Sequence, residues 1–551
     1  MAHNYISKFE VFLRNTVFGR FVYSLSRGKY FKSAEEYADY QVPSKYLDLE
    51  SKEPILVDWD SEDDPQNPQN WPLSLRLFFV LLNSFICLTV YIASAIYTPG
   101  IEQIEKDLDI SSTVATLPLS LFVIGYGIGP LIFGPLTENA KIGRMPVYFW
   151  TIFMFIILQI PTALVKNIEG FCVLRFITGL FVAAPIGVGP AAIADVIPMA
   201  YVPFAITFWS VFSVSGPALG PLIGAIFTVK ATWRWVFWFL VILNGVGLAL
   251  MAFFFPEPSS KALLYKKALI LRKKTGNENI TSSGEIELKH MSTKEVIIDT
   301  LWRPFEISIK EPVVLLIHLY ISLMYAITYL WFEAFPIVFF QTKKFTLVTM
   351  GVTYICIFVG CVIGASVYIP WSYKIFTKPM LNNEMISPEV FLPLTIVGSI
   401  IMPIGMFIFG WTSSPEINWF PPILGATLFV FGSFFVFQTL FNYLSMSFFR
   451  FLASVFSGNA AIRSIFGGVF PLFGSALFKN TGSERFPVGW GSSILGFIFI
   501  GMIAIPVLFY FNGPKLRARS KYAGLGDMGD MDVDTQPEPI SDGKESIISH
   551  V

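Results

Sequence analysis

Twelve runs of about 20 or more mostly apolar residues occupy most of this chain of 551 residues. A helix of that length spans the hydrocarbon core of a bilayer. Only 14% of the residues are charged, whereas soluble domains usually carry about a quarter. The sequence therefore predicts an all-α polytopic membrane protein. We place its twelve transmembrane helices at 73–97, 113–134, 146–165, 170–194, 203–228, 233–255, 313–340, 348–371, 391–410, 421–441, 450–478 and 487–511.

Three polar segments flank and divide these runs, and they define the expected domains. The division is an N-terminal segment (1–72), a six-helix bundle (73–255), a central loop (256–312), a second six-helix bundle (313–511) and a disordered tail (512–551).

The N-terminal segment contains two distinct patterns. Residues 5–25 place Phe12, Phe18 and Phe21 roughly along one helical face, which predicts an amphipathic helix. This helix either rests on the inner leaflet or packs on the protein's own loops. The acidic stretch 58–64 is typical of a solvated linker.

Basic residues orient the chain in the membrane. An even number of spans puts both termini on one side, and Lys and Arg gather beside the polar segments, as at Lys261, Arg272 and Lys515. By the positive-inside rule that side is the cytoplasm.

Charge and composition exclude several classes of function. Lys plus Arg and Asp plus Glu both number 39, so no basic field attracts nucleic acid. The four histidines are too scattered for a metal site. No soluble catalytic domain, nucleophile elbow or Walker A loop is present, so we expect no enzyme and no cofactor.

The two halves carry related glycine patterns. Span 2 has Gly125 and Gly129, and span 8 has Gly360 and Gly364. Glycines four residues apart allow close packing of membrane helices. Spans 5 and 11 are also rich in glycine and proline, at Gly216, Pro217, Gly220, Pro221 and Gly224 and at Gly467, Gly468, Pro471 and Gly474. The matching positions indicate a twofold repeat.

These motifs resemble the major facilitator superfamily, and within it the fungal twelve-span drug:proton antiporters, such as yeast multidrug transporters linked to fluconazole and benomyl resistance. The likeness runs from the amphipathic N-terminus through residues 63–72 to span 12. The span-5 string resembles the antiporter motif, and Arg175 with Gly179 in span 4 resembles the proton-transfer motif. The loop after span 2 resembles the gating loop, with two extra residues before Gly143; its matching positions are Gly134, Glu138, Gly143 and Arg144.

The resemblance implies two pseudo-symmetric six-helix bundles, with spans 1, 4, 7 and 10 around a central cavity. It also implies a plasma-membrane antiporter powered by the proton gradient. Its glycines in span 5 are expected to contact span 8 across the interface of the two bundles. We expect a monomer that works within the lipid bilayer.

Charged residues inside the bilayer mark the candidate proton site, because each costs about 2.5–3.5 kcal/mol to insert. Glu333 in span 7 is the one clearly internal acid, and Arg175 and Arg463 are the internal bases. We predict that Glu333 is protonated during transport, that Arg175 biases its titration, and that Asp195 belongs to the same proton-coupling set. Alternatively, Glu333 bonds to its own helix, and Arg463 binds neighbouring carbonyl groups.

Aromatic residues in the expected cavity helices form the candidate drug site. Aromatic faces suit bulky amphipathic compounds and tolerate cations. The candidates are Tyr91, Tyr325, Tyr329, Trp331, Phe332, Phe434, Phe437 and Gln438. With 56 phenylalanines in the chain, many aromatic side chains must instead face lipid or neighbouring helices.

The sequence thus predicts a multidrug exporter that exchanges cytoplasmic drug molecules for external protons. Two alternatives stay open: a proton-linked exporter of a natural metabolite such as a polyamine or siderophore, and a membrane receptor that transports nothing.

Overall fold

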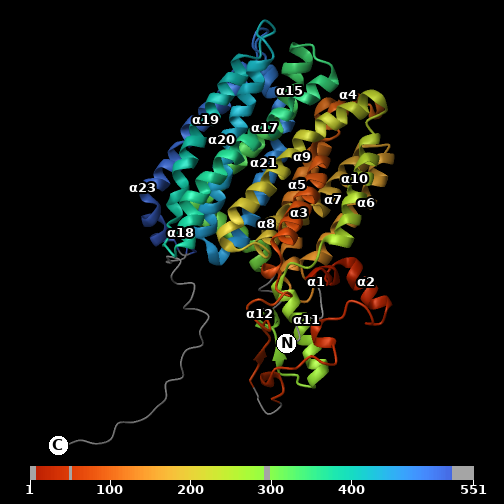
Figure 1. Cartoon of the computed structure of the whole chain (residues 1–551). Coiled ribbons are helices and arrows are strands. Elements are labelled where there is room, and N and C mark those ends of the chain that lie inside the picture. The colour runs from red at the N-terminus through yellow and green to blue at the C-terminus, as the bar shows by residue number, and fades with distance from the viewer. Residues whose placement is uncertain (1–7, 49–52, 291–297, 521, 524–551) are drawn as a thin grey trace, which may run out of the picture.

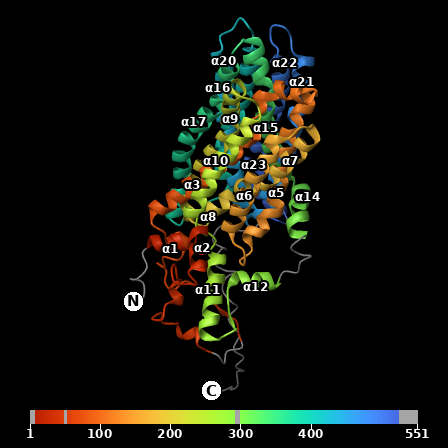
Figure 2. The ribbon, with the colours of Figure 1, turned by 90° about the vertical axis from the view of Figure 1, so that its right-hand side faces the viewer.

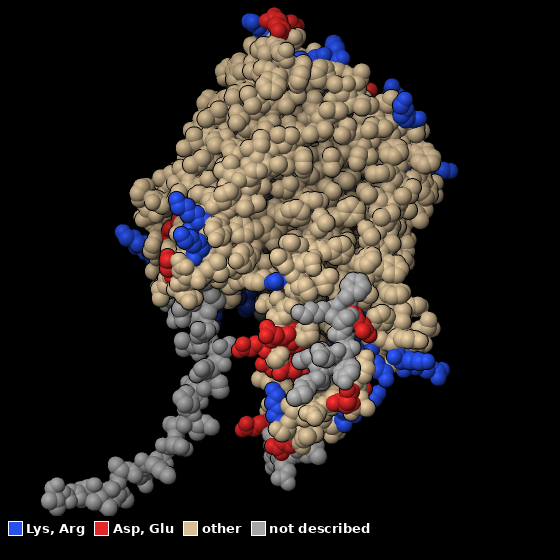
Figure 3. Space-filling view, in the orientation of Figure 1, with Lys and Arg blue, Asp and Glu red and all other residues tan. Residues whose placement is uncertain are grey.

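The computed structural model describes residues 8–48, 53–290, 298–520 and 522–523, and these contain twelve helical segments that can cross a membrane (Figure 1). The predicted all-α polytopic fold is confirmed. Charged side chains gather at the two ends of the bundle, and the surface between them is a broad uncharged band (Figure 3). We call the end at which the described residues begin, at Lys8, and stop, at Ala523, the terminal face, and the opposite end the distal face.

The first six spans follow the predicted positions, four of them with longer ends, while the third is shifted and the sixth is slightly shorter. Their helices are α3 (Leu73–Ala95) with α4 (Ile101–Leu108), α5 (Ser112–Glu138), α6 (Arg144–Leu164), α7 (Ile168–Phe181) with α8 (Ala183–Ala194), α9 (Val202–Lys230) and α10 (Trp235–Phe254). Span 4 breaks after Phe181 because Pro185 has no N–H to bond to the carbonyl of that residue.

The second six spans repeat the plan. Their helices are α15 (Pro312–Phe335), α16 (Leu347–Thr353) with α17 (Ile355–Ser372), α19 (Leu392–Trp411), α20 (Phe420–Ser447), α21 (Leu452–Thr481) and α22 (Gly489–Met502) with α23 (Ala504–Arg519). The last helix continues to Arg519, so the tail begins later than the expected residue 512. Most of that tail, 524–551, lies outside the described residues.

Helix packing shows the twofold repeat directly. In the first bundle α3 packs on α9, α5 on α7 and α6 on α10; in the second, α15 packs on α21, α17 on α20 and α19 on α22. A shift of six spans converts the first set of pairs into the second. The bundles meet along α5 with α21 and along α9 with α17, two contacts that the same shift exchanges.

The polar segments fold together on the terminal face, below the bundles (Figures 1 and 2). The N-terminal segment contributes α1 (Lys8–Arg14), α2 (Val17–Leu25) and β1 (Ile55–Leu56); the central loop contributes α11 (Ser260–Thr275), β2 (Ile280–Thr281), α12 (Ser283–His290) and α14 (Arg303–Lys310). Strand β1 pairs in parallel with β2, Ile55 opposite Ile280. We call these two segments together the terminal module.

The terminal module corrects in part the expectation that residues 58–64 form a solvated linker, since Asp58 and residues 60–63 are exposed but the end of the stretch is not. Asp64 is fully buried and accepts hydrogen bonds from the backbone N–H groups of Asp60 and Gln66. Asp60 binds Lys267 of α11 at 2.6 Å. The acidic stretch is therefore a structural partner of the basic central loop.

The helix expected over 5–25 divides into α1 and α2, because Thr16 caps the start of α2 by accepting from the N–H of Gly19 at 3.1 Å. Its first part packs on the protein itself: Phe12 lies against Trp71, with ring centroids 5.2 Å apart. Phe18 contacts Phe253 of α10 with centroids 4.9 Å apart, and Phe21 is exposed. Contact with the inner leaflet stays a prediction.

Candidate functional site

Glu333 lies in the distal half of α15, where the two bundles meet. Its carboxylate accepts a hydrogen bond from the hydroxyl of Thr116 on α5, with 3.4 Å between the oxygens. Gly474 of α21 lies beside it, since a Cβ built on that glycine would stand 3.3 Å from Cγ of Glu333. The contact with Thr116 makes Glu333 a polar link between the first and second bundles.

Arg175 is fully buried and bonds within the first bundle. It donates to the carbonyl oxygens of Ala93 at 2.9 Å and Ser94 at 3.0 Å. These carbonyls belong to the last turn of α3, whose acceptors no longer find partners inside the helix. The guanidinium also lies over the ring of Phe122 at 4.0 Å. Arg175 therefore caps α3, and the structure does not bring it together with Glu333 as expected.

Three tyrosine hydroxyls meet between the bundles. Tyr126 of α5 hydrogen-bonds to Tyr325 and donates to Tyr329 at 3.0 Å, both on α15. The ring of Tyr91 from α3 packs against that of Tyr126 at 5.8 Å. We call these four residues the tyrosine cluster. It gives the interface an aromatic surface with polar hydroxyl groups at its centre.

Arg463 of α21 places a cation on the tyrosine cluster. Its guanidinium lies 4.8 Å from the ring centroid of Tyr325 and 5.6 Å from that of Phe437. The alternative in which Arg463 serves neighbouring carbonyls has no support among the described contacts. The sequence analysis did not include Tyr126, although its place next to Gly125 in a close-packing motif was a signal. It gave Arg463 no role in the drug site, although a charge is rare in a membrane span.

The remaining aromatic candidates separate into two groups. Phe437 lies near the cluster through Arg463, and Gln438 is buried with no partner for its side-chain nitrogen among the described residues. Trp331 instead packs on Phe429 at 4.9 Å inside the second bundle. Two further candidates pack on span 8: Phe332 stacks on Tyr354, and Phe434 lies against Gly364. The alternative that these side chains are structural applies to them.

The loop after span 2 forms an ion pair at the terminal face. Nε of Arg144 lies 2.5 Å from Oδ2 of Asp195, at the end of span 4. Arg144 therefore pairs with Asp195 rather than Glu138. This contact places Asp195 with the loop after span 2, on the terminal face and away from Glu333; its part in proton coupling stays a prediction.

Glu257, which sequence reasoning overlooked, holds the start of α6. Its carboxylate accepts from the backbone N–H of Arg144 at 2.9 Å and of Met145 at 3.3 Å. Gly143 has a φ of +82°, and a Cβ there would lie 2.4 Å from Oε2 of Glu257. Glycine is therefore required at 143. Gly134 differs, since a Cβ on it would meet nothing within 4 Å.

The glycines of span 5 face α3, not span 8 as expected. A Cβ on Gly216 would lie 2.4 Å from that of Tyr91, and one on Gly224 only 1.7 Å from the carbonyl oxygen of Ile96. The expected contact with span 8 is made instead beside Pro221, where Gly351 approaches its carbonyl. The prolines and glycines thus occupy different faces: the glycines join α9 to α3 within one bundle.

A sequence model described as Major Facilitator Superfamily matches residues 84–471. The chain is 50% identical to the cycloheximide resistance protein of Candida maltosa, over 93% of this chain and 99% of that protein. It is 40% identical to fluconazole resistance protein 1 of Saccharomyces cerevisiae, over 86% of each chain. A solved structure of the proton:xylose symporter XylE has a similar fold, with a TM-score of 0.55 and 16% identity, over 80% of this chain and 96% of that one.

Proposed function

This chain belongs to the Major Facilitator Superfamily, and on that premise we propose that it is a proton-coupled multidrug antiporter of the plasma membrane. It exports amphipathic drugs from the cytoplasm, to which the terminal face is turned, and takes up protons from the distal side. Identities of 50% and 40% over most of the chain, to relatives named for cycloheximide and fluconazole resistance, support drugs as the substrate class.

The position of Glu333 carries the proposed mechanism. It is the internal acid of the spans, and it lies where the two bundles touch through Thr116. A carboxyl at such an interface meets water when the distal side opens and loses it when that side closes. Since water stabilises the charged form, opening and closing change the occupancy of the proton. Proton binding and bundle movement are thereby coupled.

The tyrosine cluster provides the drug-contact surface in this mechanism. Aromatic faces bind apolar and cationic groups without fixed direction, while the hydroxyls of Tyr126, Tyr325 and Tyr329 can exchange their mutual hydrogen bonds for polar groups of a drug. Arg463 adds one fixed positive charge. Such a surface accepts many amphipathic molecules and gives little advantage to any one shape.

The ion pair between Arg144 and Asp195 is the proposed closure of the cytoplasmic side. It joins the loop after span 2 to the end of span 4, so a drug can enter from the cytoplasm only when the surrounding helix ends move apart. The energy comes from the proton gradient, with no cofactor.

Glu333→Gln tests the proposal in everted vesicles or oriented proteoliposomes whose interior is more acidic than the medium. Wild-type protein is expected to accumulate labelled cycloheximide or fluconazole, and Glu333→Gln to fall to the level of protein-free vesicles, because a neutral amide cannot release a proton. Glu484→Gln, on the exposed distal surface, is the matched control and keeps the flux. Drug flux that ignores the pH gradient would contradict antiport; undiminished coupling in Glu333→Gln would remove this residue from the mechanism.

A further inference from the structure

A small cavity lies inside the terminal module, between the N-terminal segment and α11. It encloses about 30 Å³, and a void of 10–15 Å³ already holds one water. It is lined by Arg14, Asn15, Ser33, Glu35, Trp59, Gln66, Leu263, Lys266, Lys267 and Ile270. Three of these side chains are cationic and only Glu35 is acidic, but Asp60 and Asp64 stand directly behind the wall and act on Lys267 and Arg14.

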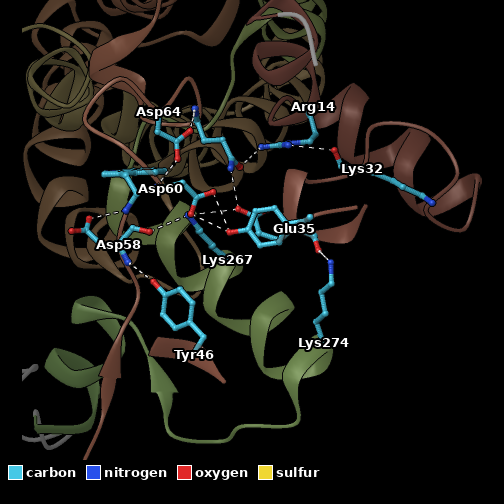
Figure 4. Close-up of polar contacts among 12 residues, drawn as sticks. Arg14, Lys32, Glu35, Tyr46, Asp58, Asp60, Asp64, Lys267 and Lys274 are labelled. Carbon is cyan, nitrogen blue, oxygen red and sulfur yellow. Dashed lines mark hydrogen bonds and ion pairs between the residues drawn. The ribbon is translucent and has the colours of Figure 1, made fainter. Parts of the chain in front are cut away.

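Most charged groups around the cavity are paired (Figure 4). Lys267 lies 2.6 Å from the carboxylate of Asp60 and 3.8 Å from that of Glu35. Gln66 accepts from Arg14 and donates to Glu35, both at 2.9 Å. The one acid of the wall is therefore already engaged by Gln66 and Lys267.

Lys266 differs from its neighbours. Its Nζ is buried and has no hydrogen-bond partner among the described residues. Arg14 and Arg20 are the nearby cations, and Glu257 is the nearby carboxylate. That carboxylate is occupied by the N–H groups of the α6 start and by Arg20 at 3.6 Å. A buried charge without a partner is costly, so either the ammonium loses its proton or an anion accompanies it.

We infer that the cavity binds a small inorganic anion, of the size of phosphate or sulfate, whose charge Lys266 neutralises. The unpaired ammonium supplies the attraction, and a volume of about 30 Å³ is small enough to exclude larger ligands. The ion joins the N-terminal segment to α11 of the central loop. Through Arg20 and Glu257, the same region connects to the start of α6 and hence to Arg144 of the cytoplasmic closure.

Thermal unfolding of the purified full-length protein in detergent tests this site without any transport assay. Sodium sulfate replaces sodium gluconate at constant ionic strength near pH 6, where sulfate keeps its charge; sodium phosphate is the second probe. A ligand that binds only the folded state raises the unfolding temperature. We expect both anions to raise it in the wild type and to have a much smaller effect in Lys266→Met.

Sulfate also stabilises proteins in general by exclusion from their surface. Lys273→Met, an exposed position on the same helix, shows this general effect and should respond to sulfate as the wild type does. The wild-type response should also decrease toward pH 9, because burial and the guanidinium of Arg20 lower the pKa of Lys266 to about 7 and the ammonium is needed. This measurement needs no variant.

An equal response to sulfate in Lys266→Met and the wild type would overturn the inference. A wild-type response no greater than the general effect would mean that the cavity holds only water, and would overturn it equally. Neither result tests drug transport, so a failure of this anion site can be distinguished from a failure of the proposed function.

Discussion

Three buried cations of this protein are stabilised in three different ways. Arg175 uses two backbone carbonyls and aromatic faces, Lys267 uses carboxylates, and Lys266 has neither. Since a buried polar group costs free energy unless it is paired, these environments predict different results when each charge is removed.

Arg175→Met removes the donor that serves Ala93 and Ser94 and leaves two buried carbonyls unpaired. The cost of each unpaired group is about 1–3 kcal/mol. We expect a lower unfolding temperature in detergent and loss of drug transport, with partial recovery in Arg175→Lys, which can reach one carbonyl. Arg485→Met, on an exposed distal pair, should unfold at the wild-type temperature. An unchanged unfolding temperature in Arg175→Met would show that the carbonyls find other partners.

Lys266 predicts a dependence of stability on pH. Burial, aided by Arg20, lowers the pKa of its ammonium to about 7 in the folded protein, whereas an unfolded lysine has a pKa of about 10.4. The folded state therefore binds fewer protons between these values, so the stability that Lys266 contributes is complete above the higher pKa and is lost as pH falls through about 7. In gluconate buffer, Lys266→Met should unfold at a higher temperature than wild type near pH 6, with a smaller difference near pH 9. A difference that is constant with pH would contradict this.

At the scale of single elements, the glycines of α9 have a steric role that sequence could locate but not assign. Gly224→Ala would place a methyl group 1.7 Å from the carbonyl oxygen of Ile96, so α9 and α3 must move apart. Overpacking of this kind costs about 1–3 kcal/mol or more. We expect poor folding and no transport, measured as the monodisperse fraction after solubilisation and as drug flux. Gly245→Ala, where a Cβ meets nothing within 4 Å, is the control and should keep both.

The length of the apolar runs predicted all twelve spans. A single segment inside a bilayer can form all its backbone hydrogen bonds only as a helix. The partner of each helix was harder to predict. The glycines of span 5 were assigned to span 8 but pack on α3, since a glycine pattern identifies a close contact without naming the helix that makes it. The sequence likewise predicted a gating role for Arg144 without identifying its partner Asp195, which lies 51 positions away.

The terminal module was the element least visible in the sequence. Its contacts join residues far apart in the chain, such as Lys267 with Asp60 and β1 with β2. An acidic stretch of this kind is usually solvated, and no local pattern identifies Lys267 as the partner of Asp60. Rarity of charge did predict Glu333 as the internal acid, because the bilayer makes each exception costly.

At the scale of the whole molecule, the two bundles touch at both faces. On the terminal side, the hydroxyl of Thr377 donates to the carbonyl of Ala200 at 2.8 Å. On the distal side, a Cβ on Gly351 would stand 2.9 Å from Leu222. Between them the tyrosine cluster joins α5 to α15. The bundles therefore touch at both ends and near the middle, and alternating access requires the two ends to separate in turn.

Alternating access therefore predicts that a link across the terminal side stops transport. Cysteines introduced together at Phe204 and Tyr373, whose rings stack across the terminal side with centroids 6.3 Å apart, can be joined by a short reducible bifunctional reagent because Tyr373 is exposed and Phe204 half-buried. The link should abolish gradient-driven drug flux, because the opening on the terminal side cannot form. Reduction should restore the flux. Three of the four natural cysteines, Cys87, Cys356 and Cys361, are buried, and Cys172 is half-buried, so the wild type treated with the same reagent is the control and should keep its activity. Full flux in the quantitatively linked protein would mean that the drug crosses without separation of these helix ends, and would contradict the rocking of two bundles.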